Sequence, residues 1–315
     1  MSNKIKSNVT ALLSVFIILS LAFLLQGCSE NAKSVSGPGF PMQITDDLGR
    51  QVTIKEAPQR IVSLAPAITE SLFALGLGDK VVGVTNYCNY PAEAKTKPKI
   101  GGFSTPSAEL VVTAMPDLVL ATKINENYVP QLENAGLTVV VIESLDLPQV
   151  LENIKLIGKV TGASAAADSL TADMQKRIDS ITSTVGGLPD DQKPNVYFEI
   201  WPDPLTTGGS KSFVNSLITM AGGKNIAGDV EQDWVNLSPE MVLARDPQVA
   251  IICHHGSSAQ TVEDFKSRKG WEQVSAIKNN RIGLVSDENT VVRTGPRVVE
   301  GFEFMAKMIH PDLIK

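Results

Sequence analysis

The sequence contains few of the side chains on which most enzymes rely for acid–base or metal chemistry. It has only 3 histidines and 3 cysteines in 315 residues. It contains no Gly-x-Ser-x-Gly nucleophile motif and no His-Glu-x-x-His zinc motif. The glycine-rich stretches at 76–81 and 208–212 lack the spacing of dinucleotide-binding and phosphate-binding loops. We therefore expect no catalytic residue, no bound cofactor and no enzymatic activity.

The spacing of cysteine and histidine gives no support for a metal site. Cys88 and Cys253 lie far apart in the sequence, and neither belongs to a Cys-x-x-Cys pair. They could form a disulfide in an oxidising compartment, but two free, buried thiols are the simpler interpretation. His254 and His255 are adjacent, and neighbouring residues on a strand point to opposite faces. We therefore interpret the two histidines as polar loop residues.

Positive charge is also scarce. The chain has 28 lysines and arginines against 34 aspartates and glutamates, which gives a net charge of −6. An acidic chain without a basic run argues against binding to nucleic acid. Aromatic residues make up only 5% of the chain, so any place where they gather is informative.

The first residues predict export and lipidation. Lys4 and Lys6 are the only charged residues before Cys28, and an apolar run at 11–25 separates them from it. A basic start, an apolar core and the ending Leu-Gln-Gly-Cys indicate a lipoprotein signal peptide at 1–27. The alternative is an uncleaved membrane helix, since about 17 apolar residues can span a bilayer.

A polar segment at 28–41, rich in serine, glycine and proline, favours the lipoprotein interpretation because it has the composition of a flexible tether. We expect cleavage before Cys28 and lipid attachment to its thiol. The mature protein would then be anchored at the outer face of the cytoplasmic membrane or in the periplasm.

Short apolar segments alternate with helical patterns along the mature chain. A β-hairpin is expected at 42–54, and strands are expected at 61–64, 81–84, 117–121 and 138–142. Continuously apolar strands that alternate with helices indicate mostly parallel sheets covered on both faces.

A long helical segment at 163–187 interrupts this alternation, which restarts with a strand at 195–200. We therefore predict an α/β fold of two lobes, residues 42–162 and 188–315. In each lobe a mostly parallel sheet is flanked by helices, and one long helix joins the two lobes.

A faint internal repeat relates the two lobes. Residues 107–120 and 238–251 share a serine at a helix N-cap, a glutamate in the first turn, a short amphipathic helix and a buried strand. The glutamates are Glu109 and Glu240. Their position favours the helix dipole, and their recurrence in both lobes suggests pseudo-twofold architecture.

Aromatic and charged residues gather at the predicted strand ends. In open α/β sheets, ligands bind beyond the carboxyl ends of the strands. Exposed aromatic side chains on rigid loops suit a pocket for a planar or bulky ligand. We therefore predict a ligand cleft formed by these loop tips. Tyr87, Phe103 and Trp201 follow predicted strands, Trp234 precedes the second copy of the repeat, and Asp287, Arg293 and Arg297 lie near the end of the chain.

Several segments resemble the substrate-binding proteins of ABC importers for iron chelates, haem and cobalamin. The resemblance covers essentially the whole mature chain and implies the class III periplasmic-binding-protein fold, with a rigid connecting helix and little hinge closure. The segments that carry it are 46–54, 60–70, 83–91, 115–120 and 207–209.

The likeness is greatest to the cobalamin-binding members of that family. It implies ligand contacts from a tyrosine, a loop aromatic, a tryptophan, an aspartate and an arginine. Two family aromatics are replaced here, by Thr122 and Leu205. We include Leu205 and the loop residue Trp201 in the predicted ligand site. The residues that match family ligand contacts are Tyr87, Phe103, Trp234, Asp287 and Arg293.

The resemblance also implies partners. Family members dock through one glutamate in each lobe onto arginines of a membrane-subunit homodimer that works with an ATPase. Those glutamates match Glu109 and Glu240, although helix-dipole stabilisation alone would also explain acidic residues there. We expect the free protein to be a monomer.

The predicted function is therefore delivery of cobalamin or a related corrinoid to an ABC importer. Within the same class, haem is an alternative, with Tyr87, Tyr90 or His254 as axial ligand. A ferric siderophore is another alternative and would require a basic pocket. An extracytoplasmic enzyme on the same scaffold, or a structural envelope lipoprotein with buried loop aromatics and no cleft, would be a different class of protein.

Overall fold

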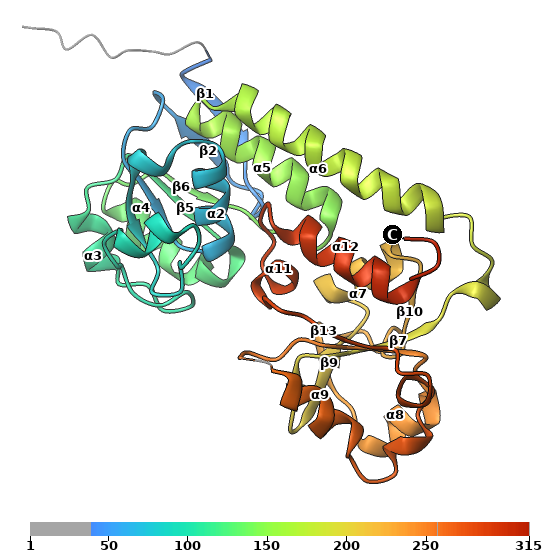
Figure 1. Ribbon diagram of the computed structural model, residues 1–315. Coiled ribbons are helices and arrows are strands. Elements are labelled where there is room, and N and C mark those ends of the chain that lie inside the picture. Colours follow the sequence, from blue (N-terminus) through green and yellow to red (C-terminus); the bar gives the residue numbers. More distant parts are fainter. Residues whose placement is uncertain (1–38, 257, 315) are drawn as a thin grey trace, which may run out of the picture. The chain divides into compact units, whose positions relative to one another are not determined.

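A computed structural model describes residues 39–256 and 258–314 (Figure 1). The predicted signal peptide and Cys28 lie outside these residues. Within the described part of the chain, none of the helices combines the length and the apolar character that a membrane crossing requires.

The expected hairpin at the start of the described chain is present. Strands β1 (Met42–Thr45) and β2 (Gln51–Ile54) pair in antiparallel register, with Ile44 opposite Val52. The Asp46 carboxylate accepts hydrogen bonds from the backbone N–H groups of Leu48 and Arg50, at 3.1 and 3.0 Å, and so closes the turn.

The first lobe contains a four-stranded parallel sheet in the order β4-β3-β5-β6. All residues of β3, β5 and β6 are buried, as expected for a sheet with helices on both faces. The elements of this lobe are β3 (Ile61–Ser63), α2 (Pro66–Ala74), β4 (Val81–Val84), α3 (Ala108–Thr113), β5 (Leu118–Ala121), α4 (Val129–Asn134), β6 (Val139–Val141) and α5 (Leu147–Thr161).

Helix α6 (Ser164–Val185) lies within the segment predicted to connect the lobes. Its 22 residues extend over about 33 Å at 1.5 Å per residue. The preceding helix, α5, ends at Gly162 in the left-handed conformation that glycine adopts without strain. Where the two helices meet, a Cβ atom on Gly158 would lie 2.4 Å from the Cβ of Ala167, so only glycine fits there.

The second lobe contains another four-stranded parallel sheet, in the order β10-β7-β12-β13, and a small antiparallel sheet in the order β11-β9-β8. The predicted α/β class is therefore confirmed. The elements are β7 (Asn195–Glu199), β8 (Trp201–Pro202), β9 (Leu205–Gly208), α7 (Phe213–Met220), β10 (Lys224–Asn225), β11 (Trp234–Asn236), α8 (Pro239–Arg245), β12 (Val249–Ile252), α9 (Ala259–Lys266), α10 (Ser275–Lys278), β13 (Ile282–Leu284), α11 (Asn289–Val292) and α12 (Val298–Ile309). Turns of 3-10 helix lie at Gly78–Lys80, Ala92–Thr96, Lys123–Tyr128, Asp190–Gln192 and Trp271–Gln273.

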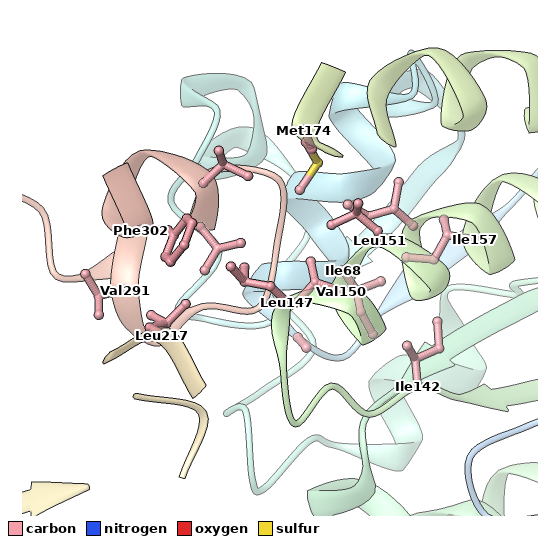
Figure 2. Close-up of a cluster of buried hydrophobic side chains, with 14 of the residues drawn as sticks. Ile68, Ile142, Leu147, Val150, Leu151, Ile157, Met174, Leu217, Val291 and Phe302 are labelled. Atoms are coloured by element: carbon pink, nitrogen blue, oxygen red, sulfur yellow. The ribbon is translucent and has the colours of Figure 1, made fainter. Parts of the chain in front are cut away.

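One apolar cluster contains residues of both lobes (Figure 2). Ile68 of α2 and Leu151 of α5 come from the first lobe, and Leu217 of α7 and Phe302 of α12 come from the second. Met174 of α6 belongs to the same cluster. Cys88 and Cys253 are also in it, as free and buried thiols.

The internal repeat has the same local geometry in both lobes. Ser107 accepts a hydrogen bond from the backbone N–H of Leu110, and Ser238 accepts one from that of Met241, each at 3.3 Å. The two predicted N-caps are therefore confirmed. The short helices α3 and α8 are followed by a residue in the left-handed region and then by proline; the left-handed residues are Met115 and Asp246.

A buried ionic cluster stabilises the second lobe. Glu199, wholly buried at the end of β7, accepts hydrogen bonds from both terminal nitrogens of Arg268, from the Tyr197 hydroxyl at 2.9 Å and from His254 Nε2 at 2.9 Å. The Arg268 guanidinium also stacks on Trp271, 4.7 Å from the ring centroid. Burial raises the pKa of Glu199. The hydrogen bonds from Arg268 and His254 lower this pKa by more than burial raises it, so the pKa lies below its usual value.

Replacing this carboxylate is predicted to be costly. Glu199→Gln leaves the Arg268 charge without its partner, and we expect a loss of about 3–5 kcal/mol in the free energy of unfolding at pH 7. Because the folded-state pKa of Glu199 is depressed, its stabilisation is present above about pH 4.3 and is lost as the pH falls through the folded-state value. The variant should therefore lose less stability than wild type on acidification below pH 4.3.

Urea unfolding at pH 7 and in steps below pH 4.3 measures both effects. Glu263→Gln is the matched control, because Glu263 forms an exposed pair with Lys266 and should change stability by about 0–1 kcal/mol. Equal losses in the two variants would contradict the role assigned to Glu199.

Candidate ligand-binding site

A pocket of about 390 Å³ lies where the first lobe meets the segment that follows α11. Its first-lobe residues come after the carboxyl ends of β3, β4 and β5, the edge at which open α/β sheets bind ligands. The structure therefore brings together three predicted site residues, Tyr87, Phe103 and Arg293. The full lining is Ala65, Pro66, Ala67, Tyr87, Phe103, Ser104, Thr122, Val292, Arg293 and Thr294.

The two aromatic side chains of the pocket are carried by fixed loops. The Tyr87 side chain is 62% exposed, while its backbone N–H donates to Thr85 Oγ1 at 3.3 Å. Phe103 is partly buried, and its carbonyl oxygen accepts a hydrogen bond from the amide of Asn125 at 2.7 Å. An exposed ring on an anchored backbone provides apolar contact area at a small entropy cost.

Arg293 reaches the pocket from the second lobe and is held by three acceptors of the first. Its Nη1 donates to Glu70 Oε1 at 2.9 Å and to Asn89 Oδ1 at 2.8 Å. Its Nη2 donates to the carbonyl oxygen of Tyr87 at 3.2 Å. The arginine thus connects the two lobes at the wall of the pocket.

Beside it, Arg297 joins the same network. Its Nε and Nη2 donate to the two oxygens of Glu70, each at 2.9 Å, and its Nη1 donates to Asp287 Oδ2 at 2.5 Å. The guanidinium also stacks on the Tyr90 ring, 3.9 Å from its centroid. The hydrogen bond to Glu70, with a further one to Asp287, raises the pKa of Arg297 above its ordinary value.

Asp287 is occupied by this network and does not line the pocket. Besides Arg297, its carboxylate accepts hydrogen bonds from the backbone N–H of Asn289 at 3.0 Å and from the Asn289 side chain at 2.6 Å. Burial raises the pKa of Asp287, but these hydrogen bonds outweigh burial and lower the pKa overall.

The predicted residues of the small antiparallel sheet occupy its two faces. Trp201 and Asn236 pair with Thr206, and Trp234 pairs with Gly208. Paired residues project to the same face, so both tryptophans lie on one face, where Trp201 is 53% and Trp234 48% exposed. Neither tryptophan lines the 390 Å³ pocket.

Leu205, which was included in the predicted ligand site, is largely buried. Its side chain is only 7% exposed and packs in a core cluster with Tyr197 and Val235. Leu205 begins β9, and strand alternation directs its side chain to the buried face. A ligand contact by Leu205 therefore stays a prediction.

Sequence reasoning missed Glu70 and Asn89. Glu70 lies in a run of five consecutive buried residues at 68–72 of α2. A buried carboxylate requires a charged partner, but the burial of Glu70 is a structural observation that the sequence alone does not give. Its partners are more than 220 positions away in the sequence, so local patterns do not identify them.

The two repeat glutamates are both exposed. Glu109 and Glu240 lie in the first turns of α3 and α8, next to the exposed apolar residues Leu110 and Met241. Hydrogen bonds from its own backbone N–H and from Ser238 lower the pKa of Glu240. Each lobe therefore presents an anionic group beside an apolar side chain.

The burial of Leu205 generates a prediction. Leu205→Ala should lower the free energy of unfolding by about 2–5 kcal/mol, because it removes buried apolar atoms and leaves a cavity. Trp201→Ala, which truncates an exposed ring of the same sheet, should cost much less. Denaturant unfolding of the two variants checks this order, and the reverse order would contradict the assignment of the sheet faces.

The sequence and the fold both have known relatives. A family model for periplasmic binding proteins matches residues 61–288. An ABC transporter substrate-binding lipoprotein of Bacillus subtilis is 36% identical over 310 residues, covering 95% of this chain and 96% of the relative. A cobalamin-binding protein of Halobacterium salinarum is 30% identical over 294 residues, covering 90% and 78%.

Solved structures agree on the fold. The periplasmic vitamin B12-binding protein of Vibrio cholerae has a TM-score of 0.71 at 23% identity, covering 81% of this chain and 98% of that one. A periplasmic haem-binding protein of Roseiflexus has a TM-score of 0.69 at 26% identity, covering 80% and 98%. The chain belongs to the periplasmic binding protein family and is an extracytoplasmic, non-enzymatic substrate-binding component of ABC transport.

Proposed function

We propose that this protein binds cobalamin or a related corrinoid and delivers it to an ABC importer. The observation that carries the proposal is the pocket in which the exposed Tyr87 ring, Phe103 and the lobe-bridging Arg293 meet. Aromatic faces contact a flat ring system well, and an arginine donates hydrogen bonds to the polar groups at its edge. Relatives named for cobalamin or vitamin B12 binding support this ligand.

In the same proposal, Trp201 and Trp234 contact the ligand from the second lobe. Both rings are about half exposed on one face of the small sheet. Asp287 acts indirectly, because its carboxylate is bonded to Arg297. Cys28, which lies outside the described residues, carries the lipid anchor.

Haem is the second candidate, and one observation favours it: an exposed tyrosine in the pocket can ligate iron. Of the three residues considered as axial ligands, only Tyr87 lines this pocket. Tyr90 lies under the Arg297 guanidinium, and His254 contacts the buried Glu199. An acidic siderophore is less well matched, because the one arginine of the lining is already bonded to Glu70.

Titration of the mature protein with cyanocobalamin, haemin and a ferric siderophore tests the proposal. We expect saturable one-to-one binding of cyanocobalamin, seen by calorimetry and tryptophan fluorescence. Tyr87→Ala should weaken it by about 10–100-fold, since burying an aromatic side chain contributes about 1.5–3 kcal/mol.

Leu313→Ala is the control, because Leu313 is an exposed apolar residue outside this pocket. Binding of haemin alone would transfer the proposal to haem. Binding of none of the three ligands would contradict it.

We further propose that Glu109 and Glu240 dock the protein onto cationic side chains of the importer's membrane subunits. Exposed ion pairs contribute only about 0–1 kcal/mol each, so these contacts set orientation more than affinity. Charge reversal at both positions replaces two attractions by two repulsions.

The double variant Glu109→Arg, Glu240→Arg should retain wild-type ligand affinity but support ligand uptake at less than about one tenth of the wild-type rate in cells that lack the native protein. Glu152→Arg, which alters an exposed glutamate of α5, is the control. Normal uptake with the double variant would exclude docking through these residues.

A further inference from the structure

The junction between the lobes contains a buried carboxylate, that of Glu70. Glu70 of α2 is 3% exposed and accepts three hydrogen bonds at 2.9 Å from Arg293 and Arg297. Both arginines follow α11, in the second lobe. A buried carboxylate is stable only with such compensation, so Glu70 and the two arginines form one unit.

Arg293 belongs both to this unit and to the pocket. Both Nη1 hydrogens are used, by Glu70 and Asn89, and one Nη2 hydrogen is used by the carbonyl oxygen of Tyr87. Among the described residues, these bonds leave the Nε hydrogen and one Nη2 hydrogen of Arg293 without a protein acceptor. The three acceptors therefore determine which part of the guanidinium a ligand can reach.

The charges of the unit balance. Arg293 and Arg297 are positive, and Glu70 and Asp287, which bond to them, are negative. The other side chains of the pocket lining are alanine, proline, tyrosine, phenylalanine, serine, threonine and valine, none of which is charged at neutral pH. The pocket thus offers hydrogen-bond donors without a net positive charge.

This balance has a consequence for selectivity. A ligand carboxylate bonded to Arg293 would share one guanidinium with the Glu70 carboxylate, and like charges so close to each other repel. A neutral acceptor such as an amide carbonyl takes the same hydrogen bond without that repulsion. The geometry therefore favours neutral acceptors at the edge of the ligand.

We propose that Glu70 is a positioning and specificity residue: it holds Arg293 in the pocket wall, compensates its charge, and so selects ligands with neutral amide acceptors over ligands with carboxylates. The inference rests on the proposed function of the pocket and deepens it by naming the chemical class of the ligand's polar groups.

The test uses two ligands of the same size and shape that differ by one charge, cyanocobalamin and its monocarboxylates, in which one side amide is hydrolysed. Wild type should bind cyanocobalamin at least about tenfold more tightly than the monocarboxylate in which the amide that bonds Arg293 is hydrolysed. The reason is that a second negative charge beside the buried Glu70 carboxylate is costly. Glu70→Gln removes the opposing charge. It should weaken cyanocobalamin binding and strengthen carboxylate binding, so that the affinity ratio falls by about tenfold or more.

A purely structural role for Glu70 would weaken both ligands equally, and an unchanged ratio in Glu70→Gln would overturn the proposal. Glu303→Gln is the matched control, because it removes one negative charge from the partly exposed Arg177–Glu303 pair, which does not line the pocket. It should change the ratio much less. If Glu70→Gln does not fold, Glu70→Asp is measured in its place. This variant keeps the negative charge and should keep the preference for the amide.

Two further measurements, one with another ligand pair and one without ligand, separate this inference from the corrinoid assignment. If wild type binds haemin and not corrinoids, haemin and its dimethyl ester replace the ligand pair, and wild type should prefer the ester. If it binds neither, the proposed function fails, and thermal unfolding of Glu70→Gln, Arg293→Gln and the double variant tests the pairing itself. The loss of Tm in the double variant should be smaller than the sum of the single losses, and additive losses would overturn the pairing.

Discussion

Helix α6 contributes Met174 to an apolar cluster that also contains side chains of α2 and α5 from the first lobe and of α7 and α12 from the second (Figure 2). Neither lobe completes this cluster alone, so separating the lobes would expose apolar surface to water. The polar network around Glu70 depends on this packing, because its acceptors and donors come from different lobes. The pocket depends in turn on that network, which holds Arg293.

The junction therefore combines two kinds of interaction with different roles. Apolar contacts are non-directional and supply most of the stabilisation, whereas the hydrogen bonds among Glu70, Arg293, Arg297 and Asp287 require particular orientations. A packed core together with a directional ionic network suits a binding site in which small changes of geometry would alter ligand contacts.

Local sequence patterns predict those strands and helix caps that depend on residues close together in the sequence. Buried strands such as Val139–Val141 follow from continuous apolar runs, and the caps of α3 and α8 follow from serine before a short helix. Tyr87, Phe103 and Arg293 were predicted from strand ends and from family resemblance, and the structure brings them to one pocket. The roles of Leu205 and Glu70 depend on strand register and on partners far away in the sequence, which no local pattern encodes.

The three tryptophans of the chain have very different surroundings. Trp201 and Trp234 are half exposed on the small sheet, whereas Trp271 is fully buried and contacts Phe265 and the Arg268 guanidinium. An indole in water emits at longer wavelength than one in an apolar core. The emission spectrum of this protein therefore combines two surface reporters, which respond to events on the exposed face of the small sheet, with one internal reporter, which responds only when the second lobe opens.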